Sequence, residues 1–259
     1  MNFKAMTAVA AALIATAPAL MAGGPDDDTM VINGEIEMTT KTEAPAHMEG
    51  TGIDTIISGW HFREDETQSQ QLSTMLRELI PQYDVVIVAD YGHGMLTPPV
   101  IDVLCSTSRF LAVNTQANAG NRGFSTISKS PRADYVCLAN HEIALEERNR
   151  RGDVREMIPS VAQKLDCPRV VVTRGKNGSL CYSSEEGFFD VPAFASQVVD
   201  RVGAGDAVLS LTALCVAQQA PMEVVGFIGN VVGAESVATI GNSSSIQRVP
   251  LLKHVESLL

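Results

Sequence analysis

Apolar residues recur along the chain at two spacings, and from residue 66 onward the two patterns alternate. A spacing of three to four residues over 66–80 predicts an amphipathic helix, which Pro81 ends. The run from Asp84 to Ala89 is almost entirely apolar and rich in β-branched residues, which is typical of a strand buried on both faces. The helical spacing is carried by Leu72, Met75, Leu76, Leu79 and Ile80.

The same patterns continue to the end of the chain. They predict further helices over 98–105, 142–149, 154–165, 207–217, 222–240 and 250–258. They predict further strands over 110–113, 135–138, 170–173, 179–183 and 188–191, with a hairpin turn at 176–178. Strands that alternate with helices form parallel βαβ units, so we expect an α/β fold.

Polar residues stand directly after several of these strands. Ligands bind open parallel sheets at the carboxyl ends of the strands. Asp90, Asn114, Asn140 and Thr173 are therefore expected to share one rim of the sheet. Two interpretations stay open for Asp90 and for the asparagines from Asn114 onward: they bind a ligand's hydroxyl groups, or they stabilise turns and loops.

The first 60 residues follow neither pattern clearly. Residues 1–24 have a positive start at Lys4, an alanine-rich apolar run and an A-x-A pattern at 17–19, as in an export signal. A buried helix and a non-native start are the alternatives. Residues 25–60 are expected to form a loop or short strands, with a hairpin turn at Asn33–Gly34. Residues 61–259 are expected to form the main domain.

The amino-acid composition restricts which partners and which stabilising features the protein is expected to have. The formal net charge of −11 argues against nucleic acid or an anionic membrane as the main partner. The 45% hydrophobic content is enough for a sizeable core. Five widely spaced cysteines without a C-x-x-C pair argue against a zinc site and a disulfide framework. Such cysteine usage is typical of a reducing compartment.

A glycine-rich turn, Gly203-Ala204-Gly205-Asp206, precedes the apolar run that ends at Ala217. The first amides of a helix have no internal acceptor, and the helix dipole makes that end electropositive, so a glycine turn opening a helix can bind an anion. Asp206 would lie beside that anion as a base. The alternative is an ordinary glycine turn with a helix-start aspartate. The dinucleotide fingerprint G-x-G-x-x-G is not met, because Val208 occupies its third glycine position.

Residues 200–207 resemble the D-x-[TV]-G-A-G-D signature of PfkB/ribokinase-type carbohydrate kinases. The resemblance extends to Asp90-Tyr91-Gly92-His93-Gly94 and to the segment 170–178, and it is strongest to kinases that act in heptose activation. It implies a ribokinase-like three-layer α/β/α fold with a mostly parallel sheet. It also implies ATP-dependent phosphorylation of a sugar or sugar-phosphate hydroxyl with Mg²⁺.

The resemblance also implies roles for individual residues. Asp206 would be the catalytic base, and the amides of Gly203, Ala204 and Gly205 would form the anion hole. Glu142 would hold magnesium through water. Asp90 and Asn114 would lie on the substrate side. The nucleotide would contact Thr173, Gly175, Gly178 and, on the adenine side, Asn230.

Two departures from the family pattern leave alternatives open. The N-x-x-E motif has Ala139 in place of its asparagine, and the family's sugar-binding features are not recognisable before Asp84. A degenerate domain that binds a nucleotide or a partner without turnover is therefore the second interpretation. An exported protein with a re-used kinase fold is the third. Because a kinase needs ATP, a cytoplasmic location is expected, without a membrane partner; a homodimer stays open.

Overall fold

The computed structural model describes residues 29–33, 53–58, 66–118, 120–240 and 246–259. Within them the strands form one eight-stranded sheet in the order β2-β1-β3-β4-β5-β6-β7-β8. The strands β1 to β6 are parallel, and β7 runs antiparallel to both of its neighbours. The predicted α/β class with a mostly parallel sheet is confirmed.

The strands and helices have the following bounds. The strands are β1 Thr29–Asn33, β2 Ile53–Ser58, β3 Val85–Asp90, β4 Leu111–Thr115, β5 Tyr135–Ala139, β6 Arg169–Thr173, β7 Ser179–Ser183 and β8 Gly187–Val191. The α-helices are α3 Glu66–Leu79, α4 Pro98–Thr107, α5 Asn140–Glu146, α6 Val154–Lys164, α7 Ala204–Ala217, α8 Met222–Val237 and α9 Arg248–Ser257. Short 3₁₀ turns lie at Ile80–Gln82, Ile127–Lys129 and Gly175–Asn177.

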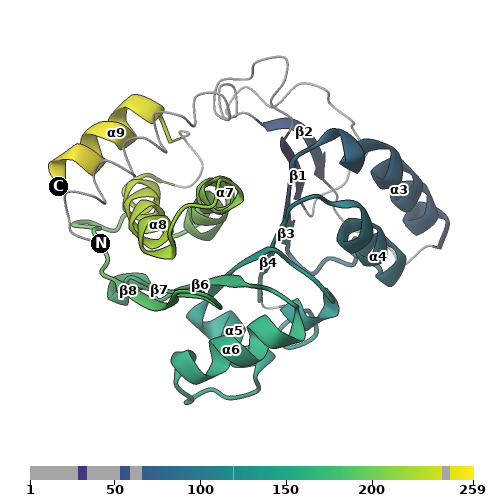
Figure 1. Ribbon diagram of the computed structural model, residues 1–259, viewed down its shortest axis with the longest axis horizontal. Coiled ribbons are helices and arrows are strands. Elements are labelled where there is room, and N and C mark those ends of the chain that lie inside the picture. Colours follow the sequence, from purple (N-terminus) through teal and green to yellow (C-terminus); the bar gives the residue numbers. More distant parts are fainter. Residues whose placement is uncertain (1–28, 34–52, 59–65, 119, 241–245) are drawn as a thin grey trace.

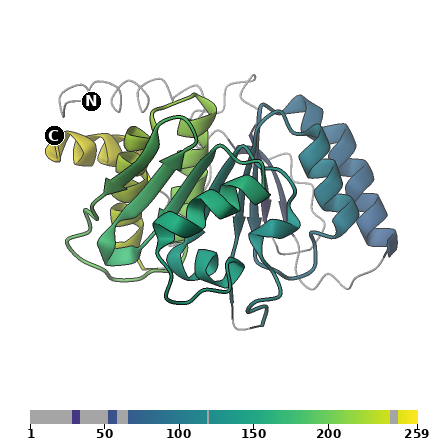
Figure 2. The ribbon, with the colours of Figure 1, turned by 60° about the horizontal axis from the view of Figure 1, so that its bottom comes forward.

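Helices cover both faces of the sheet, which makes three layers (Figure 1). Alternate residues of a strand point to opposite faces. In β3, Val86 and Val88 pack in a core with α3, α4 and α6, whereas Val85 and Ile87 pack in a second core with α7, α8 and α9. Figure 2 shows α5 and α6 in front of the strands, on the face opposite α8. This double burial explains the continuous apolar runs of the central strands.

The largest difference from expectation lies before residue 60. The strand β2 was not individually predicted, and β1 pairs in parallel with both β2 and β3 instead of turning back on itself. A hairpin at Asn33 would require an antiparallel neighbour; its second residue, Gly34, lies outside the described residues. The export-like segment 1–24 lies outside them too. The predicted domain boundary at residue 61 stays a prediction.

Several helix ends differ from the predicted ends. The helix α7 begins at Ala204, before the apolar run, and Asp206 lies in its first turn as predicted; Gly203 adopts a left-handed conformation immediately before it. The helix α8 ends at Val237, three residues earlier than expected. All five cysteines are free thiols. Among the described residues, no helix is long and apolar enough to cross a membrane.

Candidate active site

The amino end of α7 is built by a two-part turn. The Asp200 carboxylate accepts hydrogen bonds from the amides of Arg201 and Val202 at 2.6 and 3.1 Å. Gly203 then adopts φ 77° and ψ −8°, a left-handed conformation that glycine reaches without steric cost. The chain enters the helix at Ala204, so the amides of the first turn, including those of Gly205 and Asp206, have no intrahelical acceptor.

Asp206 lies in that first turn and contacts the neighbouring strand end. The Tyr91 hydroxyl, from the residue that follows β3, donates to Asp206 Oδ2 at 3.1 Å. Burial raises the pKa of the Asp206 carboxyl, and the hydrogen bond from Tyr91 opposes part of that rise. The start of α7 and the carboxyl end of β3 therefore meet, as the sequence predicted for the rim.

Gly205 has no structural explanation in the protein's own packing. It has a helical position in α7, and a Cβ atom placed there would meet no atom within 4 Å among the described residues. Glycine weakens a helix relative to alanine. Space above its Cα, next to unpaired amides, suits the close approach of an anion to the backbone.

Asp90 is tied into the protein rather than open to solvent. Its side chain is 4% exposed, and it pairs with the Lys129 ammonium group. Its Oδ1 accepts from the Gly92 amide at 2.9 Å, and its Oδ2 accepts from the Ser125 hydroxyl at 3.1 Å. These contacts join the end of β3 to the segment before β5, which is the turn-stabilising role that the sequence left open.

Asn114 and Thr173 also make contacts within the sheet. Asn114 Nδ2 donates to the carbonyl of Cys137 at 2.7 Å, and Thr173 Oγ1 donates to the carbonyl of Leu138 at 3.5 Å. Both residues are partly exposed at the strand ends. They lie near the carboxyl ends of β4 and β6, where Ala139 of the neighbouring strand β5 is in register with Thr173.

Glu142 lies in the first turn of α5 and is 8% exposed. Its Oε2 accepts from the Ala139 amide at 2.6 Å, and its Oε1 accepts from the Ala117 amide at 3.3 Å. Burial raises the pKa of Glu142; the two amides lower it, and the charge of Asp206 raises it further. The charge of Asp206 therefore reaches Glu142, although the two carboxylates share no hydrogen bond among the described residues.

A small hollow adjoins Glu142 and is lined by residues from β4, β5, α5 and the segment 117–127. Thr115 lines this hollow, and its buried hydroxyl has no hydrogen-bond partner among the described residues. Such an orphaned polar atom calls for an ordered water molecule or an ion. Among the described residues, no group of three or more His, Cys, Asp or Glu side chains could hold a metal ion by itself.

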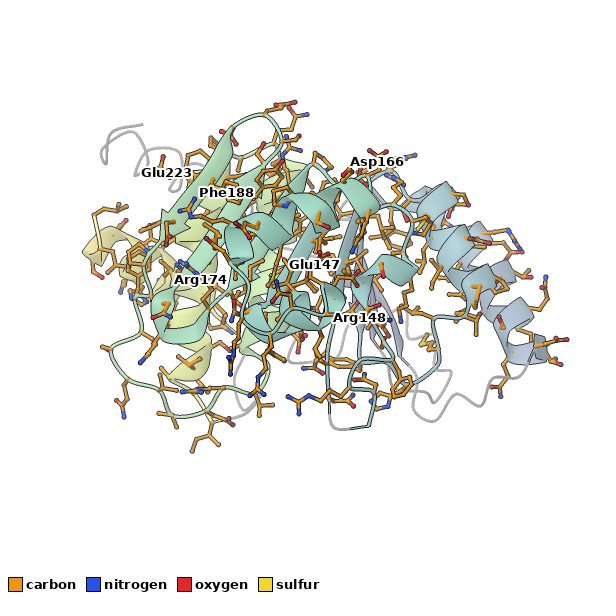
Figure 3. All side chains as sticks on the ribbon, turned by 90° about the horizontal axis from the view of Figure 1, so that it is seen from below. Glu147, Arg148, Asp166, Arg174, Phe188 and Glu223 are labelled. Carbon is orange, nitrogen blue, oxygen red and sulfur yellow. The ribbon has the colours of Figure 1, made fainter. Side chains whose placement is uncertain are left out.

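The segment after β6 is held by its own contacts. Gly175 and Gly178 adopt φ 58° and 74°, and a Cβ on Gly178 would lie 1.9 Å from the Val191 carbonyl oxygen. The Arg174 guanidinium, labelled in Figure 3, pairs with Asp190 and donates to the carbonyls of residues 177 and 179. Arg174 is therefore committed to the β7–β8 hairpin and is not directed to the start of α7.

Asn230, on α8, contacts the chain at the end of β8. Its Nδ2 donates to the carbonyls of Val191 and Pro192 at 2.9 and 2.8 Å. It thereby fixes the chain where it leaves β8. The structure brings together Asp206, Glu142 and the start of α7, and it places Gly178 and Asn230 around the end of β8.

Sequence reasoning gave Tyr91 and Thr115 no role, although both contribute to this site. Tyr91 belongs to the Asp90–Gly94 segment, so its position after a buried strand was the available signal. The Thr115 hydroxyl carried no signal, because its isolation depends on how the segment 117–127 covers it.

Comparison with known proteins places the chain in a family. Residues 100–248, more than half of the chain, match the family described as pfkB family carbohydrate kinase. The chain belongs to this family. It is 29% identical over 184 residues to the bifunctional protein HldE of Desulfatibacillum aliphaticivorans and 26% identical over 186 residues to that of Trichlorobacter lovleyi. These matches cover 69% and 68% of this chain but only 37% and 36% of those relatives.

Solved structures show the same fold. Phosphofructokinase-2 from Escherichia coli, in complex with potassium, matches with a TM-score of 0.67 at 15% identity, over 97% of this chain and 86% of that one. A putative ribokinase II from E. coli, in complex with ATP and Mg²⁺, matches with a TM-score of 0.56 at 15% identity, over 70% of this chain and 61% of that one. The predicted ribokinase-like fold and carbohydrate-kinase family are confirmed.

Proposed function

We propose that the protein is an ATP-dependent phosphotransferase that acts on a hydroxyl group of a sugar or sugar phosphate. The observation that carries this proposal is the position of Asp206: a partly buried carboxylate in the first turn of α7, hydrogen-bonded to Tyr91 at the carboxyl end of β3 and next in sequence to Gly205, whose Cα has open space above it. Membership of the pfkB family supports the reaction class.

In this proposal Asp206 takes the proton from the acceptor hydroxyl. The acceptor oxygen bonds to the γ-phosphorus as the bond to the oxygen bridging the β- and γ-phosphates breaks, and ADP leaves. Burial raises the pKa of Asp206, which suits this step, since a stronger base accepts the proton more readily. The amides of Gly203, Ala204 and Gly205 would stabilise charge on the transferred group.

Glu142 and Thr115 fit a hydrated magnesium ion that accompanies ATP. Magnesium keeps several of its waters, so a single carboxylate with a nearby hydroxyl can hold it without a full protein cage. The bound ion would neutralise charge on the nucleotide phosphates. We also propose that Thr173 and Gly175 line the phosphates, with Gly178 and Asn230 shaping the nucleotide side through the end of β8.

The proposed acceptor is a heptose phosphate. Its support is the resemblance around Asp90–Gly94 and the similarity to HldE proteins. Asp90 would act indirectly, by fixing the turn, whereas Asn114 keeps a direct position at the rim. The proposed partners are small molecules, the proposed location is the cytoplasm, where ATP is available, and a homodimer is an arrangement to test.

The experiment is a panel of sugars and sugar phosphates, including heptose phosphates, assayed for ADP formation by the full chain with Mg-ATP. Product is identified by mass spectrometry, which separates transfer to the sugar from ATP hydrolysis. The Asp206→Asn variant serves as the control, because it keeps size and polarity but cannot accept the proton. Sugar-dependent ADP release that survives in this variant would overturn the assignment of the base.

A second function is favoured by one observation. Both carboxylate oxygens of Glu142 already accept hydrogen bonds, from the amides of Ala139 and Ala117. In addition, Ala139 stands where the family motif has an asparagine. A domain with this arrangement would bind nucleotide without turnover. Stabilisation of the fold by Mg-ATP, together with no acceptor-dependent ADP release across the panel, supports this alternative.

A further inference from the structure

We propose that Tyr91 is a positioning residue that fixes the Asp206 carboxylate and leaves one of its oxygens for the acceptor. The inference rests on the proposed function for its catalytic meaning, but the contact itself does not. The Tyr91 hydroxyl donates to Asp206 Oδ2 at 3.1 Å. Among the described residues, Oδ1 of Asp206 has no hydrogen-bond partner. An oriented base is more effective than a freely rotating one, because a base can take a proton only when it lies within hydrogen-bond reach of it.

The backbone of Tyr91 is held by two asparagine side chains. Two side-chain amides, Asn118 Nδ2 and Asn121 Nδ2, donate to its carbonyl oxygen at 2.8 and 2.7 Å. Asn121 is 7% exposed and also donates to the Gln116 carbonyl at 3.0 Å. These asparagines, which the sequence offered as ligands for sugar hydroxyls, use their amide groups to hold a turn instead.

The residues on either side of Tyr91 are held as well. Gly92 has φ 70°, and a Cβ there would lie 2.0 Å from Asn121 Nδ2, so only glycine lets the asparagine pack against the turn. Asp90 is anchored by Lys129 and by the Ser125 hydroxyl. All these contacts come from one segment, 116–129. That segment therefore holds the turn, and the turn holds the phenol ring against the start of α7.

The proposed link runs from the segment 116–129 through Tyr91 to the base. It gives Asp206 a fixed side-chain orientation before a substrate arrives. It also supplies a donor to the ionised carboxylate, in a place where burial disfavours the charge. If Tyr91 only stabilised the fold, it would affect neither the orientation nor the pKa of Asp206. A positioning role and a purely stabilising role can therefore be separated by experiment.

The test compares the wild type with Tyr91→Phe, which removes the hydroxyl and keeps the ring. In the acceptor assay, kcat is expected to fall about tenfold, the KM for ATP to stay unchanged, and the acid limb of the pH profile to move to higher pH. The control is Tyr135→Phe, a β5 substitution that removes a buried 2.7 Å hydrogen bond to Thr212, which lies six residues after Asp206 in α7. It is expected to lower the melting temperature without moving the acid limb.

A second readout separates this inference from the proposed function. The Asp206 carboxyl is titrated by carbon-13 NMR in the full chain, assigned with Asp206→Asn, and needs no turnover. Tyr91→Phe is expected to move the titration to higher pH, and 3-fluorotyrosine placed at position 91, a stronger donor, to lower pH. Equal titrations in all three proteins overturn the inference. Shifted titrations in a protein that transfers no phosphoryl group support the contact and count against the proposed kinase reaction alone.

Discussion

The amide nitrogen of Ala139 lies 2.6 Å from Oε2 of Glu142 and donates a hydrogen bond to it. Ala139 is the last residue of β5, and Glu142 is three residues further on, in the first turn of α5. A carboxylate that reaches back to the start of its own helix satisfies an amide that the helix leaves unpaired. Ala139, which stands where the family motif has an asparagine, thus holds Glu142 through its backbone amide. This contact does not depend on the side chain at position 139.

This contact predicts a divided effect for Glu142→Gln. The side-chain amide can accept only one of the two backbone hydrogen bonds, so we expect a loss of about 1–2 kcal/mol in unfolding free energy, measured in urea. If Glu142 also holds magnesium through water, the magnesium concentration for half-maximal ADP formation will rise severalfold. Glu156→Gln, which changes an exposed carboxylate on α6, is the matched control. An unchanged magnesium dependence would leave Glu142 as a helix cap.

Replacing the proposed base should separate activity from stability. Asp206→Asn is expected to lower acceptor-dependent ADP formation by about 10²–10⁴-fold, since it removes general-base catalysis. At neutral pH the same variant is expected to melt at a higher temperature than the wild type. The reason is that burial raises the pKa of Asp206, so its ionised form destabilises the folded state.

The pH dependence of that difference has a definite sign. Because the folded-state pKa is raised, the folded state binds the proton more tightly than the unfolded state. Wild-type stability from this group is greatest at low pH and is lost as pH rises from the unfolded pKa through the raised folded pKa. The gap in melting temperature between Asp206→Asn and the wild type should therefore close as the pH falls. A gap of constant size would contradict the assigned burial effect.

Regular patterns predicted the parts of the fold that local physics controls. The runs at 84–89 and 170–173 are apolar because both faces of β3 and β6 are covered. They could therefore be predicted as buried strands from the sequence alone. The strand β2 was missed because its pairing with β1, 24 residues earlier at Thr29, depends on tertiary contacts. A short strand has too few residues for its own spacing to decide its state.

The candidate site, like the fold, could be predicted from the sequence only where local motifs mark it. The glycine spacing marked the Gly203–Asp206 turn, the strand-end rule placed that turn at one rim with Asp90 and Asn114, and the family resemblance pointed to Glu142. What the sequence could not tell was how the polar groups pair. Asn121 and Asp90 contact residues that are 30 and 35 positions away, Tyr91 and Ser125 respectively, and such pairing is set by how the segments pack.

Two glycines of the α7 turn should respond in opposite ways to alanine. Gly203→Ala places a residue with a Cβ atom in a left-handed backbone conformation and is expected to cost about 1–2 kcal/mol of unfolding free energy. Gly205→Ala enters open space in a helix and is expected to leave stability unchanged or raise it by up to about 1 kcal/mol. If an anion approaches that backbone, Gly205→Ala will nevertheless weaken the ATP-dependent rise in melting temperature. A full rise would show that the space above Gly205 is not used by the nucleotide.

The two glycines after β6 separate a structural role from a nucleotide-binding role. Gly178→Ala combines a φ of 74° with a clash against the Val191 carbonyl oxygen, a backbone atom that cannot move aside easily. We expect it to cost about 2–4 kcal/mol in unfolding free energy. Gly175→Ala has a φ of 58° but no atom within 4 Å of the new methyl group among the described residues, so we expect about 1–2 kcal/mol.

Urea unfolding of both variants measures these costs, and melting with and without Mg-ATP measures nucleotide binding in the same proteins. Asn230→Ala belongs in this set, because it frees the carbonyls of Val191 and Pro192 that the asparagine holds. If Gly175 lines the phosphates, Gly175→Ala will reduce the ATP-dependent shift out of proportion to its small loss of stability. If all three variants lose the shift in proportion to their stability, the segment after β6 acts on the nucleotide through the fold of the β7–β8 hairpin rather than by contact.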